Sequence, residues 1–316
     1  METNSKLSTL ESQYKPPCGI RLFLHILIEV IREGTEKSIK ISMVVENFRT
    51  MFYWLIIGVI ALGMILTKMF SVTTEETDPN IILADVFGAS NVCAYFDAPP
   101  SNYFLPFFWL FPMLCAMIYD IISIFRIWVS YREEKISLVS TNLLVFAHIY
   151  FMLTVMLFGT IFAVSPDRKD PATMIIHSLP FLNLRFGLCI LQFAVVWFGV
   201  EVAWKDFKLS KWFIAVNWCH VGLQILMVVI SVILVINALG DMGPGELKGK
   251  GLWWSVHNNT QMNTFTNIFV NYIGFLLNFV IPLLQSQYFS YKGFKNISNT
   301  HAVVISIADN RKSGIE

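Results

Sequence analysis

The stretch TMIIHSLPFLNLRFGLCILQFAVVWFGVEVAW, residues 173–204, indicates how this chain is built. It is long enough to cross a bilayer, and yet it carries an arginine, Arg185, near its middle. An arginine at the centre of a membrane span costs about 2.5–3.5 kcal/mol on insertion scales, so it normally faces protein or water rather than lipid. The stretch therefore predicts a membrane helix whose polar face is turned towards the interior of a helical bundle.

The composition of the whole chain agrees with a membrane protein. Of its 316 residues, 55% are hydrophobic and only 14% are charged, and the mean hydropathy is +0.59. Soluble domains carry about 25% charged residues. The net charge of +1 does not favour a nucleic-acid partner, and the five cysteines show neither metal-like nor disulfide-framework spacing. We therefore expect an integral membrane protein in contact with the lipid bilayer, with no nucleic-acid partner and no bound metal.

Six apolar runs have the length of a membrane span. They are residues 51–70, 103–128, 141–164, 173–203, 212–238 and 265–288. The expected fold class is all-α, a polytopic six-helix transmembrane domain over residues 51–288. A cytosolic amino-terminal segment, 1–50, precedes it, and a cytosolic tail, 289–316, follows it.

Residues 20–31 form a shorter apolar run that is interrupted by charged and polar side chains. From Arg21 to Glu36 these side chains recur at spacings of three and four residues, which leaves a wide apolar arc between them. This pattern predicts an amphipathic helix that lies in the plane of the membrane surface. Two alternatives are that the helix packs on the cytosolic ends of the bundle, or that it crosses the membrane as a seventh span.

The distribution of lysine and arginine predicts the orientation of the spans. Seventeen of these residues fall in the segments 1–50, 126–140, 204–211 and 289–316, and four fall in the segments on the other side. Cytosolic segments are enriched in Lys and Arg, so both termini are expected in the cytosol. Asn258 begins a glycosylation sequon on the predicted external side, whereas the sequon at Asn296 would be cytosolic and unused. A plasma membrane or an endomembrane suits these span lengths.

Three ionisable residues lie at matched depth near the predicted cytosolic side. Asp120 lies eight residues from Trp128 in the second span, and His148 lies seven residues from Thr141 in the third. His220 lies at a similar depth in the fifth span. A carboxylate beside imidazoles can carry a proton or bind a cation, because each group alters the protonation of the others. The alternative is that each residue is satisfied separately by a backbone carbonyl or a hydroxyl group.

Amide side chains add a second polar layer. Gln192 follows Arg185 on one face of the fourth span, and Gln224 shares a face with His220. In the sixth span Asn271 and Asn278 belong to a stripe of amides that runs from Asn267 to Gln285. One interpretation is a hydrated pathway with Arg185 near its middle, where it attracts an anion or pairs with Asp120. The other is structural, because amides often hold membrane helices together at about 0.6 kcal/mol each.

These patterns favour a small transporter or a proton-linked channel that acts on a small ion or small-molecule substrate. The candidate pathway residues are Asp120, His148, Arg185, Gln192, His220, Gln224, Asn271 and Asn278. The sequence carries none of the histidine or serine motifs of lipid-modifying enzymes, so an enzymatic role is not favoured. The oligomeric state is open, with a homo-oligomer as one alternative.

Two other functional classes are considered. A transmembrane di-haem electron-transfer protein would use two axial pairs, His148 with His220 and His177 with His257, and haem would then be the cofactor. A non-catalytic receptor or scaffold would act through the acidic first external loop, residues 71–102. Under the transporter hypothesis no cofactor is expected.

Overall fold

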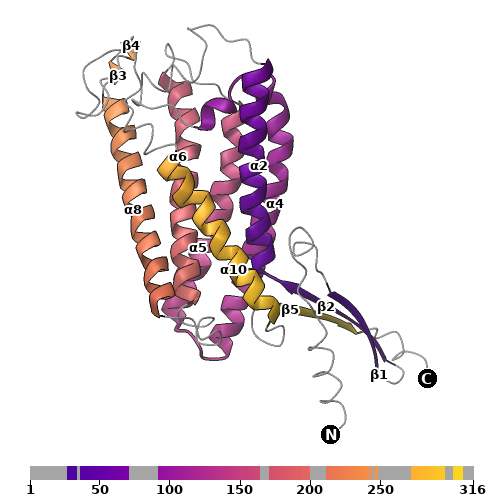
Figure 1. Cartoon of the computed structure of the whole chain (residues 1–316). Coiled ribbons are helices and arrows are strands. Elements are labelled where there is room, and N and C mark those ends of the chain that lie inside the picture. Colours follow the sequence, from indigo (N-terminus) through magenta and orange to yellow (C-terminus); the bar gives the residue numbers. More distant parts are fainter. Residues whose placement is uncertain are drawn as a thin grey trace.

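A computed structural model describes residues 27–33, 36–70, 92–163, 171–199, 211–240, 242–243, 246–247, 272–295 and 302–308. Its main body is a bundle of long helices (Figure 1). In chain order these are α2 (Glu46–Phe70), α4 (Ser101–Arg132), α5 (Leu138–Phe158), α6 (Pro171–Phe198), α8 (Lys211–Gly240) and α10 (Ile281–Lys295). The short helices η2 (Val92–Tyr95) and η3 (Gly159–Ala163) lie beside them, and the π-helical turn η6 (Leu276–Val280) precedes α10.

Within the described ranges, five helices are long and apolar enough to cross a membrane. They are Glu46–Phe70, Ser101–Arg132, Leu138–Ala163, Leu179–Phe198 and Lys211–Ile233. The helical fold class and five of the six predicted spans are thereby confirmed. The sixth predicted span, 265–288, stays a prediction, because residues 265–271 lie outside the described part of the chain and the π-helical turn η6 interrupts the rest.

The helices follow one another around the bundle. Consecutive helices α2, α4, α5, α6 and α8 pack side by side, and α10 returns to pack on α2 while η6 contacts α6 and α8. Figure 1 shows α10 crossing obliquely between α8 and α2. The bundle therefore has two ends. We call the end where α2 begins and α4 finishes the Glu46 end, and the opposite end, beside η2, the Asp97 end.

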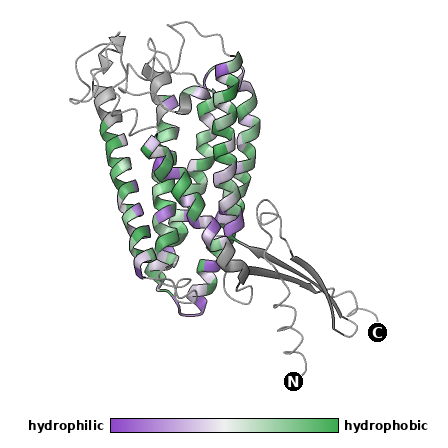
Figure 2. Ribbon diagram, viewed as in Figure 1, coloured by the Kyte–Doolittle hydropathy of each residue, from purple (hydrophilic) through white to green (hydrophobic). Residues whose placement is uncertain are grey.

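The surface and interior of the bundle have the polarity expected in lipid. Hydrophobic residues cover most of the visible helix surface in Figure 2. On α4 the exposed side chains include Phe104, Phe107 and Phe111, whereas the buried ones include Asp120 and Ser123. Polar groups are costly in contact with hydrocarbon, so this arrangement places them where protein partners can satisfy them.

Close packing joins neighbouring helices through small residues and aromatic rings. Trp109 of α4 donates a hydrogen bond from its indole nitrogen to the carbonyl of Val155 on α5, at 3.2 Å. Gly187 of α6 lies so close to α5 that a Cβ atom built on it would stand 2.1 Å from Oγ1 of Thr154. Ser137 caps the start of α5 by accepting a hydrogen bond from the backbone of Ser140, at 3.1 Å.

A small antiparallel sheet lies outside the bundle and joins the two terminal segments. Strand β2 (Glu36–Val44) pairs with β1 (Leu27–Glu33) on one edge and with β5 (Ala302–Ala308) on the other. Ile41 lies opposite both Ile28 and Ile305. Two very short strands, β3 (Met242–Gly243) and β4 (Glu246–Leu247), pair after α8.

The amphipathic helix expected over residues 20–31 is not confirmed. Residues 27–31 belong to β1, and residues 20–26 lie outside the described ranges. The reason is pairing: β1 exchanges backbone hydrogen bonds with β2, and β2 with β5. The spacing of charges in this segment fits a helix locally, but pairing with strands far along the chain overrides that preference.

Candidate functional site

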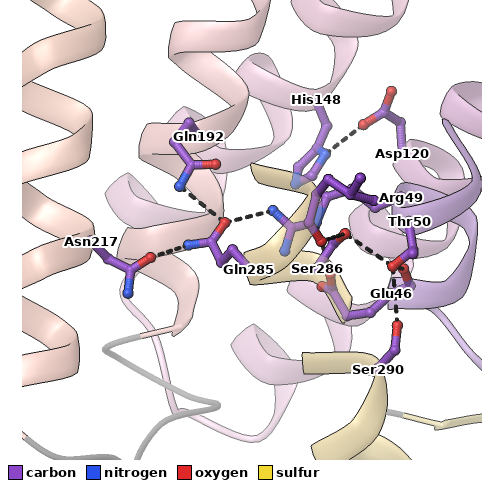
Figure 3. Close-up of polar contacts among 11 residues, drawn as sticks. Glu46, Arg49, Thr50, Asp120, His148, Gln192, Asn217, Gln285, Ser286 and Ser290 are labelled. Carbon is purple, nitrogen blue, oxygen red and sulfur yellow. Dashed lines mark hydrogen bonds and ion pairs between the residues drawn. The ribbon is translucent and has the colours of Figure 1, made fainter. Parts of the chain in front are cut away.

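Asp120 and His148 form a buried pair at the Glu46 end. Asp120 projects from α4 and His148 from α5, and Oδ1 of the carboxyl lies 2.8 Å from Nδ1 of the imidazole (Figure 3). Asp120 is fully buried and His148 is 3% exposed. The second carboxyl oxygen, Oδ2, has no hydrogen-bond partner within the described residues. The structure thus brings together two of the three residues predicted to share this layer.

A small cavity opens beside this pair. It offers about 30 Å³ to the centres of water molecules, which is room for about two waters. Its polar lining consists of Glu46, Tyr119, Ser123, Arg126 and His148. Its apolar lining comes from Ile127 of α4, Val195 and Phe198 of α6, and Phe289 of α10. The cavity is therefore lined by residues of five helices and has both charges and hydrogen-bonding groups on its wall.

Two polar side chains at the cavity wall, those of Ser123 and His148, each have a hydrogen-bonding group that no described residue uses. The hydroxyl of Ser123 is buried, and no described residue accepts or donates a hydrogen bond to it. His148 uses Nδ1 for Asp120, so its Nε2 is the nitrogen left for the cavity. Buried polar groups normally have a partner, and a group without one at a cavity indicates water or a ligand.

Arg49 links α2 to α10 next to the cavity. Its side chain is fully buried, and Nε donates to the carboxylate of Glu46 at 2.7 Å. Its Nη1 donates to Oε1 of Gln285 at 3.0 Å. Gln285 also accepts a hydrogen bond from Gln192 of α6, at 3.0 Å, and donates one to Asn217 of α8 (Figure 3). One glutamine thus joins four helices.

A second set of contacts holds the same two helices together. Thr50 of α2 donates through its hydroxyl to Ser286 of α10, at 2.9 Å, and lies 3.3 Å from the hydroxyl of Ser290. All three side chains are buried. The carboxyl-terminal helix is therefore fixed to α2 by hydrogen bonds over more than one helical turn.

His220 is separate from the Asp120–His148 pair. Its Nε2 donates to the backbone carbonyl of Leu277, at 2.7 Å, and Gln224 donates to the same carbonyl at 2.9 Å. Leu277 belongs to the π-helical turn, where the hydrogen-bond register of the backbone changes and a carbonyl becomes available. Asn278 beside it is 5% exposed. His220 therefore bonds to a backbone carbonyl and does not join the predicted cluster with Asp120 and His148.

Arg185 lies within the bundle but away from the cavity wall. Its guanidinium donates to the hydroxyl of Ser231 on α8 and stands 4.5 Å from the ring centroid of Phe181. It is 7% exposed, so the predicted inward direction holds. A pair with Asp120 was one of two alternatives for Arg185, and the Asp120 carboxyl instead bonds to His148.

A second carboxylate–imidazole pair lies at the Asp97 end. Oδ2 of Asp97, just before α4, stands 3.5 Å from Nε2 of His177 on α6. Asp97 is 3% exposed and His177 is 2% exposed. Burial raises the pKa of Asp97 well above its usual range, because desolvation disfavours the carboxylate. The two pairs thus lie near opposite ends of the bundle.

The histidines of the di-haem hypothesis have partners from the protein. His148 contacts Asp120, His177 contacts Asp97 and His220 contacts the Leu277 carbonyl, while His257 lies outside the described residues. Across the described ranges, no three or more His, Cys, Asp or Glu side chains group to hold a metal ion. The haem hypothesis stays a prediction, which a Soret absorption band of the purified protein would test.

Two predicted residues lie outside the described part of the chain, and three residues near the cavity were not predicted to be site residues. Asn271 and the glycosylation candidate Asn258 are not among the described residues. Arg49 was counted among the cytosolic basic residues and Glu46 fell in the same amino-terminal segment, although opposite charges three residues apart on a helix can pair. Ser123 lies on the same helical face as Asp120, and that spacing could have identified it.

Comparison with known proteins finds no family, no curated relative and no solved structure that matches this chain. Its function is therefore inferred from the geometry of the bundle.

Proposed function

We propose that the protein is a proton-linked transporter or channel, and that the Asp120–His148 pair carries the proton. The observation behind this proposal is that the pair is buried in the bundle and borders a polar cavity at the Glu46 end. Imidazole titrates near neutral pH, and a carboxylate bonded to one of its nitrogens fixes which nitrogen faces the cavity. Ionisable groups inside a membrane bundle most often mark a substrate or proton pathway.

The position of the second pair supports the same function. A proton or solute that crosses the bundle needs groups to receive it at both ends, and Asp97 with His177 provides such a pair at the Asp97 end. Between the two pairs, α6 carries Arg185 and Gln192 in buried positions. Helix α6 therefore contributes polar groups from one end of the bundle towards the other.

We also propose that the chain crosses the membrane an even number of times and that both termini are cytosolic. Strand β2 precedes the first spanning helix, and it pairs with β5 after α10. Paired strands lie on the same side of a membrane, so the chain between them crosses an even number of times. Five spanning helices are seen in the described residues, and the predicted span 265–288 supplies the sixth. The positive-inside distribution places the two strands in the cytosol.

Proton flux in proteoliposomes tests the proposed function. Vesicles with the purified full chain and a trapped pH dye receive a potassium diffusion potential, first in sulfate medium and then with a carboxylate, an amino acid or a sugar added. We expect faster internal acidification than in protein-free vesicles. Asp120→Asn and His148→Gln should slow it about tenfold or more, because each removes a proton-accepting group.

The matched control is Glu133→Gln, which removes an exposed carboxylate beyond the last turn of the same helix and should leave the flux unchanged. If wild-type vesicles acidify no faster than protein-free vesicles under any of these conditions, the proposed function is wrong. If both variants carry wild-type flux, the pair does not carry the proton.

A further inference from the structure

We propose that the cavity at the Glu46 end binds a small planar monovalent anion, such as a carboxylate, together with the proton. This inference rests on the proposed function, because it names the solute that would accompany the proton. The anion would accept hydrogen bonds from the hydroxyl of Ser123 and from Nε2 of His148. Both groups line the cavity, and neither is engaged there by a described residue.

The tautomer of His148 couples the anion to the proton. With Asp120 ionised, Nδ1 carries a hydrogen and donates it to Oδ1, at 2.8 Å. In the neutral ring Nε2 then has a lone pair, which repels an anion. Protonation turns Nε2 into a donor while the bond to Asp120 is kept. Nε2 therefore becomes a third donor to the anion, beside the Ser123 hydroxyl and the Arg126 guanidinium, only when His148 carries the additional proton.

The charges around the cavity select an anion rather than a cation. Among the described residues, Glu46 and Asp120 supply two negative charges. Arg49 and Arg126 balance them, so the proton on His148 leaves one positive charge in excess. A monovalent anion restores neutrality in a region where an uncompensated charge is costly.

Among the described side chains that line the cavity, no other titratable group alters this count. On α2 and α4, Tyr53 and Tyr119 are the remaining titratable neighbours, and the Tyr119 ring centroid lies 5.8 Å from that of His148. Tyrosine is neutral in the range where imidazole titrates. The parts of α6 and α10 that line the cavity are apolar.

The size of the cavity sets the class of anion. Room for about two waters suits a carboxylate group or a similarly small planar anion. Arg126, which also lines the cavity, has the planar guanidinium that matches carboxylate geometry. The remaining wall includes the apolar side chains of Phe198 and Phe289, so the cavity has little room beyond the carboxylate group itself.

Formate binding to the purified full chain in detergent tests this proposal. Formate stays ionised across the interval from about pH 5 to about pH 8, in which imidazole titrates. We expect calorimetry in buffers of different ionisation enthalpy to show uptake of one proton for each formate bound. Because binding takes up one proton, it should weaken by up to about tenfold for each pH unit as the pH rises through the range in which imidazole titrates. This measurement uses the wild-type protein, so its outcome does not depend on whether a variant folds.

Variants assign the effect to the two donors. Ser123→Ala should weaken formate binding about tenfold and keep its pH dependence, because one hydrogen bond is lost. His148→Gln should remove the pH dependence, since an amide does not titrate. Arg132→Gln, an exposed arginine at the end of the same helix, is the control and should bind like the wild type.

Three results would overturn the inference: no formate binding, binding without proton uptake, or binding that both cavity variants leave unchanged. These results differ from a failure of the proposed function. Proton flux in vesicles without formate binding contradicts the anion site alone. Proton-linked formate binding without any flux contradicts the transport function alone.

Discussion

At the scale of single residues, the bundle depends on a few positions that allow no larger side chain. Gly187 is the clearest of these, because α5 and α6 approach each other at its Cα. A Cβ atom there would stand 2.1 Å from Oγ1 and 3.1 Å from Cβ of Thr154. That hydroxyl is also fixed, since it donates to the carbonyl of Phe151 at 2.8 Å.

Gly187→Ala is therefore expected to separate the two helices and lower the free energy of unfolding by about 1–3 kcal/mol, as overpacking does elsewhere. Thermal unfolding in detergent measures the loss. Thr154→Ala in the same chain should restore part of it, because Oγ1 and Cγ2 are then absent. Gly222→Ala is the matched control, with nothing within 4 Å of the added Cβ. Equal melting temperatures for the two glycine variants would contradict the close approach.

The protonation of Asp97 gives a pH dependence with a definite sign. Burial raises the pKa of this carboxyl well above its usual range in the folded protein. Below about pH 4 the folded and unfolded chains are both protonated at this position. As the pH rises, the unfolded chain releases its proton first, so the contribution of Asp97 to stability is lost with increasing pH. His177, 3.5 Å away, offers partial compensation while it is protonated.

Wild-type protein should consequently lose melting temperature relative to Asp97→Asn as the pH rises from about 4 towards the pKa of the buried carboxyl. Thermal scans of both proteins in one set of buffers check this. Glu133→Gln, which replaces an exposed carboxylate, should follow the wild-type profile. A constant difference in melting temperature between wild type and Asp97→Asn at all pH values would show that burial does not raise the pKa of this carboxyl.

The sequence was sufficient to identify some site residues and not others. Depth along each span grouped Asp120 with His148 and His220, because ionisable groups at equal depth on neighbouring helices can meet. The same criterion failed for His220, because it contains no information on which helices are adjacent. Here the carbonyl of Leu277 is the nearer partner. Arg49 was missed because charges before a span were attributed to orientation rather than to the interior.

At the scale of elements, the link between α8 and the π-helical turn is the most specific feature. Two side chains one helical turn apart, His220 and Gln224, meet one backbone carbonyl at Leu277. A π-helical turn leaves backbone groups out of the regular ladder, and these must find partners in a membrane protein. The side chains of α8 thus complete the hydrogen bonding of the segment that leads into α10.

Replacement of both side chains should cost more than the sum of the two single replacements. His220→Leu or Gln224→Leu leaves the Leu277 carbonyl with one donor, and each should cost about 0.6 kcal/mol. The double variant leaves it with none, which adds the larger cost of a buried unsatisfied carbonyl. Unfolding of all four proteins in a double-mutant cycle measures the coupling. Leu223→Ala, on the exposed face, is the control, and additive losses would contradict a shared acceptor.

Elements outside the bundle were the hardest to predict. Alternation of apolar and polar residues over 38–43 is a strand signal, but the spacing of charges from Arg21 to Glu36 fits a helix equally well. The strand conformation is stabilised by pairing with β5, which lies more than 250 residues away in the sequence and completes the sheet. Apolar run length, in contrast, is a local property, and it identified all five spanning helices.

At the scale of the whole molecule, the paired terminal segments constrain the number of crossings. Among the described residues five helices are long and apolar enough to span a membrane, and the proposed even number of crossings between β2 and β5 adds a sixth. Two natural sequons, at Asn258 and Asn296, flank the predicted sixth span. They report directly whether residues 265–288 cross.

Translation into endoplasmic-reticulum microsomes is expected to add a glycan at Asn258 alone, because only that sequon would face the lumen. Endoglycosidase treatment should shift the wild type, and Asn258→Gln should abolish the shift. Asn296→Gln is the control and should migrate like the wild type before and after treatment. Loss of one glycan in Asn296→Gln would place that sequon in the lumen and contradict the cytosolic tail.

The sheet also has a consequence for the order of biosynthesis. Strand β2 is made early, yet one of its two neighbours, β5, leaves the ribosome only after every membrane helix has been synthesised. Until then β2 presents an open edge, which is prone to pair with other chains. A chain that stops before residue 302 would lack β5 and would keep that edge of β2 unpaired.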